Sequence, residues 1–345
     1  MIARAFVDEG DVVGLQVPTY LAAVQAFDLR GARYQRVPWE MEWKGVSGMA
    51  TERSGASGRW PEGKDGSAPA RRAGGAGRLK GDGTGLPKSD GAERLKLVYV
   101  VSNFANPSGE CLSVAERKGL LRWAAANRVF VLEDDPYGEL RFAGSALPSM
   151  WELAQEIPGA APWVGYASSL SKIVAPGLRI GWLILPEAVR ETVARIKQAL
   201  DLHTSSFSQE IAAKYLASGK LEGRLEMARR SYAAQCEALA SAVREEFGDE
   251  VEFKKPEGGM FLWCRFREGI DTTELLPRAR EHGVIFVPGA VFYPGGGDAS
   301  TMRLSFSAVS PDDLREGVRR LGRAVRVSIG AGETFGYGRQ VRLAD

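Results

Sequence analysis

Four groups of polar residues in this sequence could cooperate in one reaction. Lys172 has the most reactive side chain, because its amine can add to an aldehyde and form a Schiff base. It follows the hydroxyl residues Ser169 and Ser171. The other groups are Asn106-Pro107-Ser108-Gly109, Asp134-Asp135-Pro136-Tyr137 and Arg303. Taken alone, each has an ordinary explanation as a turn, a strand end, a helix cap, a surface lysine or a structural ion pair.

Arg303 is the least easily explained as a purely structural residue. It stands between Met302 and Leu304 in a segment that we predict to be a strand, where an arginine needs a structural carboxylate or a ligand anion as its partner. Its planar guanidinium matches a carboxylate in a two-point contact. A lysine Schiff base with pyridoxal phosphate needs an acid at the pyridine nitrogen, donors for the phenolic oxygen and phosphate, and an arginine for the amino-acid carboxylate. The four groups together meet these needs.

The surrounding pattern predicts elements that could bring these groups together. Residues 95–101 and 129–132 have the composition of buried strands, and Ser113 to Asn127 between them reads as a helix with a capping box of Ser113 and Glu116. This rhythm predicts an α/β fold with a mainly parallel sheet sandwiched by helices. In such sheets, polar residues just past the C-terminal strand ends line the ligand crevice. Two further strands, 163–167 and 178–185, flank Lys172.

The rest of the chain predicts a large domain from 1–44 and 94–219 and a smaller C-terminal α+β domain from 220–326. Residues 45–93 contain thirteen of the 41 glycines and a single aromatic residue, Trp60, so we expect a disordered insertion. Helices are predicted at 187–201, 207–218, 220–247, 272–282 and 311–325, with short strands between the last three. Residues 327–345 are predicted to be a loose tail.

Composition excludes several classes of function. The formal net charge is only +2, so nucleic acid is not an expected partner. No apolar run approaches the ~20 residues of a membrane span, and the N-terminus lacks the apolar segment of a secretory signal. Three widely spaced cysteines and two histidines argue against a disulfide framework, a metal site or a histidine-based triad. We therefore expect a cytoplasmic protein.

The sequence resembles the fold-type I, class I/II aminotransferases over residues 1–43 and 95–325. It resembles most the branch of 2-aminoadipate and kynurenine aminotransferases and the aminotransferase-like domains of MocR-type regulators. The resemblance is carried by NFANPSG, VLEDDPYGELRF, SSLSKIVAPGLRIGW, PEGGMFLW, GVIFVPGAVFYPGG and MRLSFS. It implies a homodimeric enzyme that uses pyridoxal 5'-phosphate to move an amino group between an L-amino acid and a 2-oxo acid.

The resemblance also implies a role for each candidate residue. Lys172 would form the internal aldimine and shuttle the proton between the substrate's α carbon and the cofactor's C4′ carbon. Asp134 would pair with the pyridine nitrogen, while Asn106 and Tyr137 would hydrogen-bond the phenolic oxygen. The remaining cofactor residues would be Tyr20, stacked on the ring, and Ser169, Ser171 and Arg179, which would hold the phosphate. Arg303, with Asn106 beside it, would bind the substrate carboxylate.

Some of these residues keep a structural alternative. Tyr20 could be a core aromatic residue at a helix start, Ser171 could be a helix cap, and Asp135 is interpreted as structural rather than catalytic. Family members also carry a longer N-terminal region with part of the phosphate site, so a truncated start is expected here. Two alternative functions therefore stay open: a cofactor-binding effector domain of a MocR-type regulator, and an inactive relic.

Overall fold

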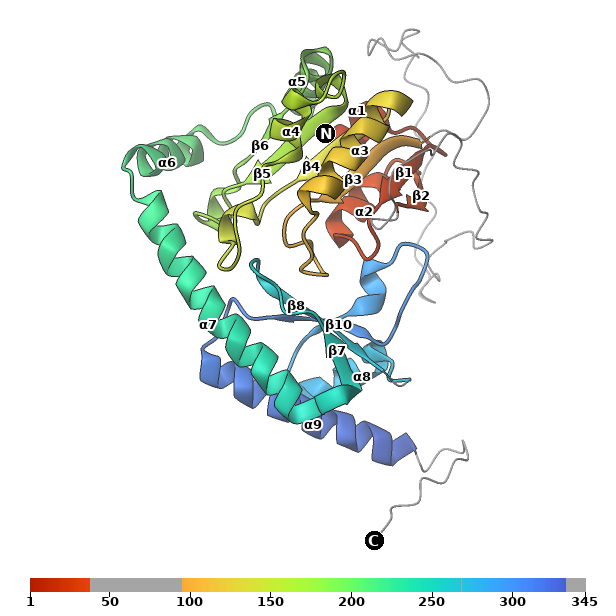
Figure 1. Ribbon diagram of the computed structural model, residues 1–345, viewed down its shortest axis with the longest axis vertical. Helices are drawn as coiled ribbons and strands as arrows, with labels where there is room; N and C mark the ends of the chain where they lie inside the picture. The colour runs from red at the N-terminus through yellow and green to blue at the C-terminus, as the bar shows by residue number, and fades with distance from the viewer. Residues whose placement is uncertain (38–94, 268, 333–345) are drawn as a thin grey trace.

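The computed structural model of the protein describes residues 1–37, 95–267 and 269–332. These residues form an upper part built on a six-stranded sheet and a lower part built on a four-stranded sheet (Figure 1). The long helix α7, Leu221–Phe247, runs along one side of the molecule from the upper part to the lower part. The predicted insertion at 45–93 lies outside the described residues.

The upper sheet has the strand order β2-β1-β3-β4-β5-β6. Its strands, from β1 to β6, are Val12–Leu15, Arg33–Arg36, Leu95–Val101, Phe130–Asp134, Val164–Ser169 and Gly181–Ile184. All neighbouring strands are parallel except β5 and β6, which confirms the predicted mainly parallel sheet. The parallel strands bring their C-terminal ends to one edge of the sheet, where the candidate residues of the sequence lie.

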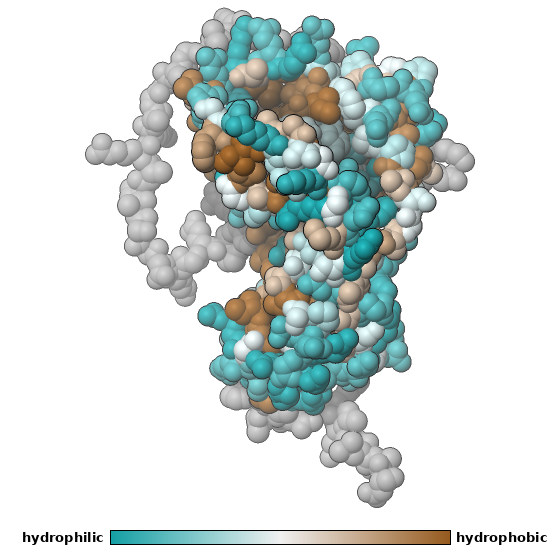
Figure 2. Space-filling view, turned by 90° about the vertical axis from the view of Figure 1, so that its left-hand side faces the viewer, coloured by the Kyte–Doolittle hydropathy of each residue, from teal (hydrophilic) through white to brown (hydrophobic). Residues whose placement is uncertain are grey.

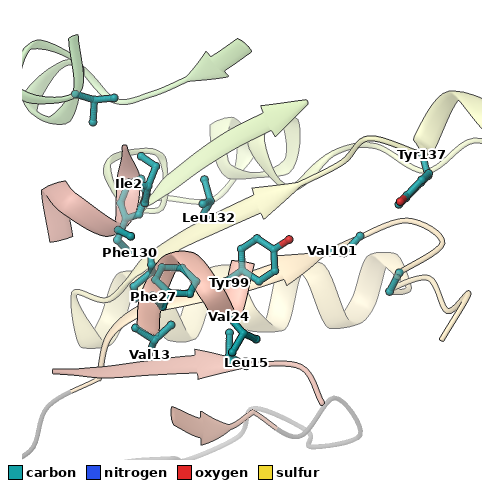
Figure 3. Close-up of a cluster of buried hydrophobic side chains, with 14 of the residues drawn as sticks. Ile2, Val13, Leu15, Val24, Phe27, Tyr99, Val101, Phe130, Leu132 and Tyr137 are labelled. Atoms are coloured by element: carbon teal, nitrogen blue, oxygen red, sulfur yellow. The ribbon is translucent and has the colours of Figure 1, made fainter. Parts of the chain in front are cut away.

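Helices cover both faces of this sheet. Helices α1 (Ile2–Phe6), α2 (Leu21–Asp28) and α5 (Glu187–Asp201) pack on one face, and α3 (Val114–Asn127) and α4 (Met150–Glu156) pack on the other. Figure 3 shows the cluster of the first face, which includes Val13, Leu15, Tyr99 and Leu132. Because both faces are covered, the central strands β1, β3 and β4 are mostly apolar along their length rather than alternating.

Local sequence signals explain why some helices and strands are predicted and others are not. Helix α3 begins at the expected capping box, in which Ser113 and Glu116 exchange side-chain-to-backbone hydrogen bonds. Strand β2 and helix α4 are missing from the prediction. Strand β2 is a short polar edge strand, Arg33-Tyr34-Gln35-Arg36, and α4 spans only 7 residues, so neither contains enough apolar periodicity.

The lower sheet is antiparallel, with the order β7-β8-β10-β9. Its strands are Val251–Phe253, Phe261–Phe266, Val287–Pro288 and Thr301–Ser305 for β7, β8, β9 and β10. Its core is shared with α7, α8 (Thr272–Glu281) and α9 (Pro311–Gly332). The expected helix at 311–325 thus continues to Gly332, and the predicted start of the tail at residue 327 falls inside it. Arg278 Nη1 donates to the Val327 carbonyl and Ser328 Oγ to that of Ala324, which stabilise this extra length.

One side of the upper part carries exposed apolar side chains. Figure 2 views the molecule from the side of α6 (Ser206–Ala217) and α7, and shows hydrophobic patches in the upper part above a mostly hydrophilic lower part. Exposed apolar residues on β6, α5 and α6 include Trp182, Ile184, Leu200, Phe207 and Ile211. Among the described residues, no helix is long and apolar enough to cross a membrane.

Candidate active site

Three neighbouring strands deliver the candidate residues to one edge of the upper sheet. Asp134 is the last residue of β4 and pairs in register with Val101 at the end of β3 and with Ala167 in β5. Asn106 follows β3 in a buried loop, and Lys172 lies three residues beyond the end of β5. The expected convergence of β3, β4 and β5 therefore follows from their order in the sheet.

Arg303 reaches this edge from the lower sheet. It lies in the middle of β10, and its Nη1 donates a hydrogen bond of 2.7 Å to Asn106 Oδ1. Asn106 also hydrogen-bonds the hydroxyl of Tyr137, which is buried after β4. The rings of Phe261 and Phe292 flank the guanidinium, with centroids 4.2 and 5.2 Å from Cζ. The two sheets thus meet at Arg303 and Asn106.

The guanidinium of Arg303 has unused hydrogen-bonding capacity. Its Nε is buried and has no hydrogen-bond partner among the described residues. Burial lowers the pKa of Arg303, since the charged form loses water without gaining a carboxylate in return. A buried, unpaired donor on a cation costs free energy, and an anion bound at this point would offset that cost.

Asp134 is a buried carboxylate with a neutral partner. Tyr99 Oη donates to Asp134 Oδ2 at 2.6 Å. Burial raises the pKa of Asp134 to about 6, the hydrogen bond from Tyr99 lowers it, and neighbouring Asp135 raises it. No cation is among the described groups that shift this pKa. A protonated ring nitrogen would provide the missing positive charge.

The surroundings of Lys172 favour the neutral, reactive form of its amine. Burial lowers its pKa, and the positive charges of Arg303 and Arg179 lower it further. A lower pKa increases the fraction of neutral amine, and only the neutral amine adds to an aldehyde. Because Arg303 and Arg179 both lower this pKa, both guanidiniums lie within electrostatic range of Lys172.

Two of the expected phosphate residues, Ser169 and Arg179, already make hydrogen bonds within the chain. Ser169 Oγ donates to the Ile180 carbonyl at 3.2 Å and accepts from the Ser171 backbone N–H at 2.9 Å. Arg179 is exposed, has φ 55° and donates through Nη1 to the Pro176 carbonyl at 3.2 Å. Its other N–H groups and the Ser171 hydroxyl are the more accessible donors. Ser169 could donate to a phosphate only by giving up its bond to Ile180.

Tyr20 lies at the surface rather than in the core. It caps the start of α2 and is 38% exposed. It raises the pKa of both Tyr99 and Tyr137, so it lies close to these two hydroxyls. The preceding Thr19 donates its backbone N–H to the Phe292 carbonyl at 2.9 Å, which fixes this turn against the lower part.

The loop that carries Asn106 is held by an unusual packing arrangement. Phe104 is fully buried and has φ 48°, a left-handed conformation that is rare for a bulky residue. Its ring packs on Gly258 and Gly259 so closely that a Cβ on Gly258 would overlap it. Arg141 lies over the same ring, 4.6 Å from its centroid. These contacts compensate for the strained backbone two residues before Asn106.

Asp135 supports the turn after β4, in agreement with its structural interpretation. It accepts hydrogen bonds from Asn103 Nδ2 and from the Gly138 backbone N–H, both at 2.9 Å. Asn103 in turn accepts from Arg117, whose fully buried guanidinium also donates to the carbonyls of Leu112, Pro148 and Ser102. These contacts hold the loops after β3 and β4 together.

Sequence reasoning misses several residues that touch this site. They are Tyr99, Arg117, Phe261 and Phe292. Tyr99 and Arg117 leave a weak signal, since each places a polar group in an otherwise apolar strand or helix face. The two phenylalanines leave none, because apolar residues in a predicted strand or loop are explained by packing alone.

Comparison with known proteins agrees with this geometry. Residues 1–321 match the family model of aminotransferase class I and II, so the chain belongs to this family. It is 36% identical over 327 residues to a 2-aminoadipate transaminase of Thermus thermophilus, covering 94% of this chain and 72% of that protein. It is 32% identical to aromatic-amino-acid aminotransferase 1 of Thermococcus litoralis, with 94% and 69% covered.

A solved structure has the same architecture. The α-aminoadipate aminotransferase of Thermus thermophilus, complexed with N-(5'-phosphopyridoxyl)-L-leucine, gives a TM-score of 0.77 at 31% identity, over 96% of this chain and 75% of that chain. An HTH-type transcriptional regulator of Bacillus subtilis, YisV, is also similar, with 31% identity over 67% of this chain and 46% of the regulator. The family and these relatives identify the chain as a transaminase, and proteins of this family depend on pyridoxal phosphate.

The donor set fits that cofactor and does not fit a metal. Among the described residues, no group of three or more histidine, cysteine or carboxylate side chains could hold a metal ion. The buried carboxylate of Asp134, the amine of Lys172 and the unpaired Nε of Arg303 instead offer one partner each for a ring nitrogen, an aldehyde and a carboxylate.

Proposed function

We propose that this chain binds pyridoxal 5'-phosphate at Lys172 and catalyses transamination between an L-amino acid and a 2-oxo acid. The observation that carries this proposal is the unpaired, buried Nε of Arg303 beside Asn106, at the same strand ends as Asp134 and Lys172. When bound, the cofactor supplies an aldehyde that condenses with amines and a pyridine ring that accepts electrons. Each side chain then has one task.

Lys172 Nζ would hold the cofactor and later move a proton. Its lowered pKa provides a neutral amine for the aldehyde. With substrate and cofactor bound, Lys172 Nζ would act as the base and acid that moves a proton between the substrate α carbon and the cofactor's C4′ carbon. The same nitrogen can do both because a neutral amine accepts a proton and the resulting ammonium donates it.

The residues around Lys172 would orient the two reactants. Asp134 would accept a hydrogen bond from the protonated ring nitrogen, and Asn106 and Tyr137 would donate to the phenolic oxygen. The contact from Arg303 occupies Asn106 Oδ1 and so leaves the amide N–H groups of Asn106 as the donors of this side chain. Tyr20 would cover the ring, and Ser169, Ser171 and Arg179 would donate to the phosphate.

Arg303, aided by Asn106, would bind the substrate carboxylate. The rings of Phe261 and Phe292 exclude water from the guanidinium and strengthen its attraction for an anion. The names of the relatives suggest 2-aminoadipate and aromatic amino acids as the donors to test first, and the leucine adduct in the solved structure suggests branched-chain amino acids as a third class. We propose that the products are the corresponding 2-oxo acids.

The test is reconstitution of the purified chain with pyridoxal phosphate. We expect a visible absorption band on binding, and borohydride reduction should leave a covalent adduct that peptide mapping places on Lys172. Lys172→Ala should abolish both the adduct and transamination, while Lys197→Ala, which removes a lysine paired with Asp201 on α5, should leave both intact. Substantial transamination by Lys172→Ala would refute the role of this lysine, and the absence of band and adduct in the parent chain would refute cofactor binding.

Measurements on the same reconstituted protein also test two alternative functions. A regulator effector domain, suggested by the similarity to YisV, would bind the cofactor and an amino acid without turnover. An inactive relic would form no adduct at all. Sustained 2-oxo acid production from any of the three donor classes would exclude both.

We also propose that the working protein is a cytoplasmic homodimer that binds neither nucleic acid nor membrane. The exposed apolar side chains on β6, α5 and α6 support self-association, since contiguous exposed apolar surface commonly marks an interface. The free thiols of Cys111, Cys236 and Cys264 agree with a reducing compartment. Light scattering after size exclusion would report the mass of one chain if the dimer proposal is wrong.

A further inference from the structure

Tyr99 is a core residue whose hydroxyl reaches the candidate site. It lies on β3, in register with Leu132 of β4, and Leu132 shares a face of the sheet with Asp134 two residues further on. Two residues of a strand span ~6.6 Å, which is about the length of a tyrosine side chain. The hydroxyl therefore arrives at the strand end, where it donates to Asp134 Oδ2 at 2.6 Å. Figure 3 shows it directed along the strands toward Val101 and Tyr137.

The phenol ring is fixed by its surroundings. Tyr99 is 3% exposed, and its ring makes an edge contact with Phe27 of α2, with centroids 6.1 Å apart. It also belongs to the apolar cluster of Leu15 and Val24 on the same face of the sheet. A ring packed in this way has one position, so its hydroxyl gives Asp134 a fixed hydrogen-bond donor.

The hydrogen-bond partner of Asp134 is a neutral phenol, so it does not cancel the negative charge with which Asp134 would attract a cation. A lysine or arginine at position 99 would neutralise Asp134 and compete with a protonated ring nitrogen. A phenol orients the carboxylate through Oδ2 and leaves both its negative charge and Oδ1 for a second donor. Within the described part of the chain, Tyr99 is the side chain that hydrogen-bonds Asp134.

We propose that Tyr99 is a positioning residue that holds the Asp134 carboxylate in the one orientation that serves the cofactor's ring nitrogen. The proposal rests on the role proposed above for Asp134. It assigns no contact with the substrate or the reacting atoms to Tyr99, which acts only through Asp134.

The hydrogen bond also acts on the ionisation of Asp134. It lowers the pKa of Asp134, whereas burial and the neighbouring Asp135 raise it, with about 6 as the net value. Tyr20 and Tyr137 are the other titratable groups that face Tyr99. Loss of the hydroxyl should therefore move the Asp134 pKa above about 6 and leave part of the carboxyl protonated near neutral pH.

The decisive variant is Tyr99→Phe, which removes one oxygen and keeps the ring. Tyr34→Phe is a matched control, because Tyr34 donates to Asp28 at 2.7 Å on the surface of α2, away from the strand ends. The first measurement uses the cofactor-free protein with carbon-13-labelled aspartate, and Asp134→Asn identifies the resonance of Asp134. Its pKa should rise in Tyr99→Phe and stay unchanged in Tyr34→Phe.

The second measurement is the dissociation constant of pyridoxal phosphate, followed by absorbance. Tyr99→Phe should weaken binding roughly 10-fold, the effect of losing one hydrogen bond to a charged group, and Tyr34→Phe should not. In the reconstituted enzyme, kcat should fall while KM for the amino acid stays near its parent value. Thermal unfolding of both variants reports any general loss of stability.

A graded substitution keeps the test valid if Tyr99→Phe folds poorly. Incorporation of 3,5-difluorotyrosine at position 99 makes the phenol a stronger donor, so the Asp134 pKa should move down instead of up. An unchanged Asp134 pKa in either substitution, or unchanged cofactor affinity in a folded Tyr99→Phe protein, would overturn the proposal. A missing Lys172 adduct would instead refute the proposed function, and the cofactor-free titration is independent of that outcome.

Discussion

Arg303 and Asn106 stand 197 residues apart in the sequence, and a hydrogen bond of 2.7 Å joins their side chains. Arg303 belongs to the antiparallel lower sheet, and Asn106 belongs to a loop of the parallel upper sheet. In the function proposed here, one of these residues holds the substrate and the other holds the cofactor. This single hydrogen bond thus fixes the distance between the residue that would bind the substrate and the residue that would bind the cofactor.

Arg303→Lys should impair amino-acid binding even though it preserves the charge. Lysine cannot bind a carboxylate at two points while also donating to Asn106. We expect kcat/KM to fall by roughly 30-fold to several thousand-fold, corresponding to about 2–5 kcal/mol for a buried charged contact. Arg265→Lys, on an exposed position of β8, is the control and should change kcat/KM less than about 2-fold. Equal effects of the two substitutions would contradict the carboxylate role of Arg303.

The charge of Arg303 should set the pH at which Lys172 captures pyridoxal phosphate. Burial and two nearby guanidiniums lower the Lys172 pKa. Removing one positive charge in Arg303→Met should raise that pKa toward the ordinary value of a lysine, whereas Arg303→Lys should keep it low. Stopped-flow capture rates measured between pH 6 and 10 test this, because the rate follows the neutral amine. Coincident pH profiles for Arg303→Met and the parent protein would exclude the coupling.

Asp134→Asn should stabilise the cofactor-free protein while weakening cofactor binding. The folded pKa of about 6 exceeds the ordinary aspartate value of 3.8, so the contribution of Asp134 to stability is complete below pH 4 and is lost as the pH rises through 6. A shift of this size corresponds to about 3 kcal/mol, from which the lost hydrogen bond to Tyr99 must be subtracted. Urea unfolding at pH 4 and pH 8 should show a difference between the proteins that grows with pH. Equal differences at the two pH values would show that Asp134 titrates normally.

Gly258→Ala should disturb the site through Phe104. A Cβ at this position would overlap the Phe104 ring, and overpacking typically costs about 1–3 kcal/mol. Because Phe104 lies two residues before Asn106, we expect the variant to lose cofactor affinity as well as stability. The double variant Gly258→Ala/Phe104→Leu should recover part of the stability, as measured by urea unfolding in a double-mutant cycle. Additive effects would show that the two positions do not interact.

The sequence could predict those site residues whose side chains are chemically unusual for their place in the chain. Lys172, Asp134 and Arg303 are detectable because a reactive amine, an acid at a strand end and an arginine in an apolar strand all need partners. Their positions after successive strands also predict the mainly parallel sheet that brings Lys172 and Asp134 together. Tyr99, Phe261 and Phe292 could not be predicted as site residues, since an aromatic residue in an apolar segment is adequately explained by packing.

The succession of polar residues and apolar segments in the sequence shows which polar residue follows which strand, and hence which side chains share one edge of the upper sheet. The tertiary structure sets how the lower sheet meets that edge, because the contact of Arg303 with Asn106 depends on packing across 197 residues and not on any local pattern. It likewise decided that the Ser169 hydroxyl donates to the Ile180 carbonyl and that a phenol from the core orients Asp134. Hydrogen-bond partners depend on distances of a few tenths of an ångström, and those distances are fixed by the packed core rather than by residue type.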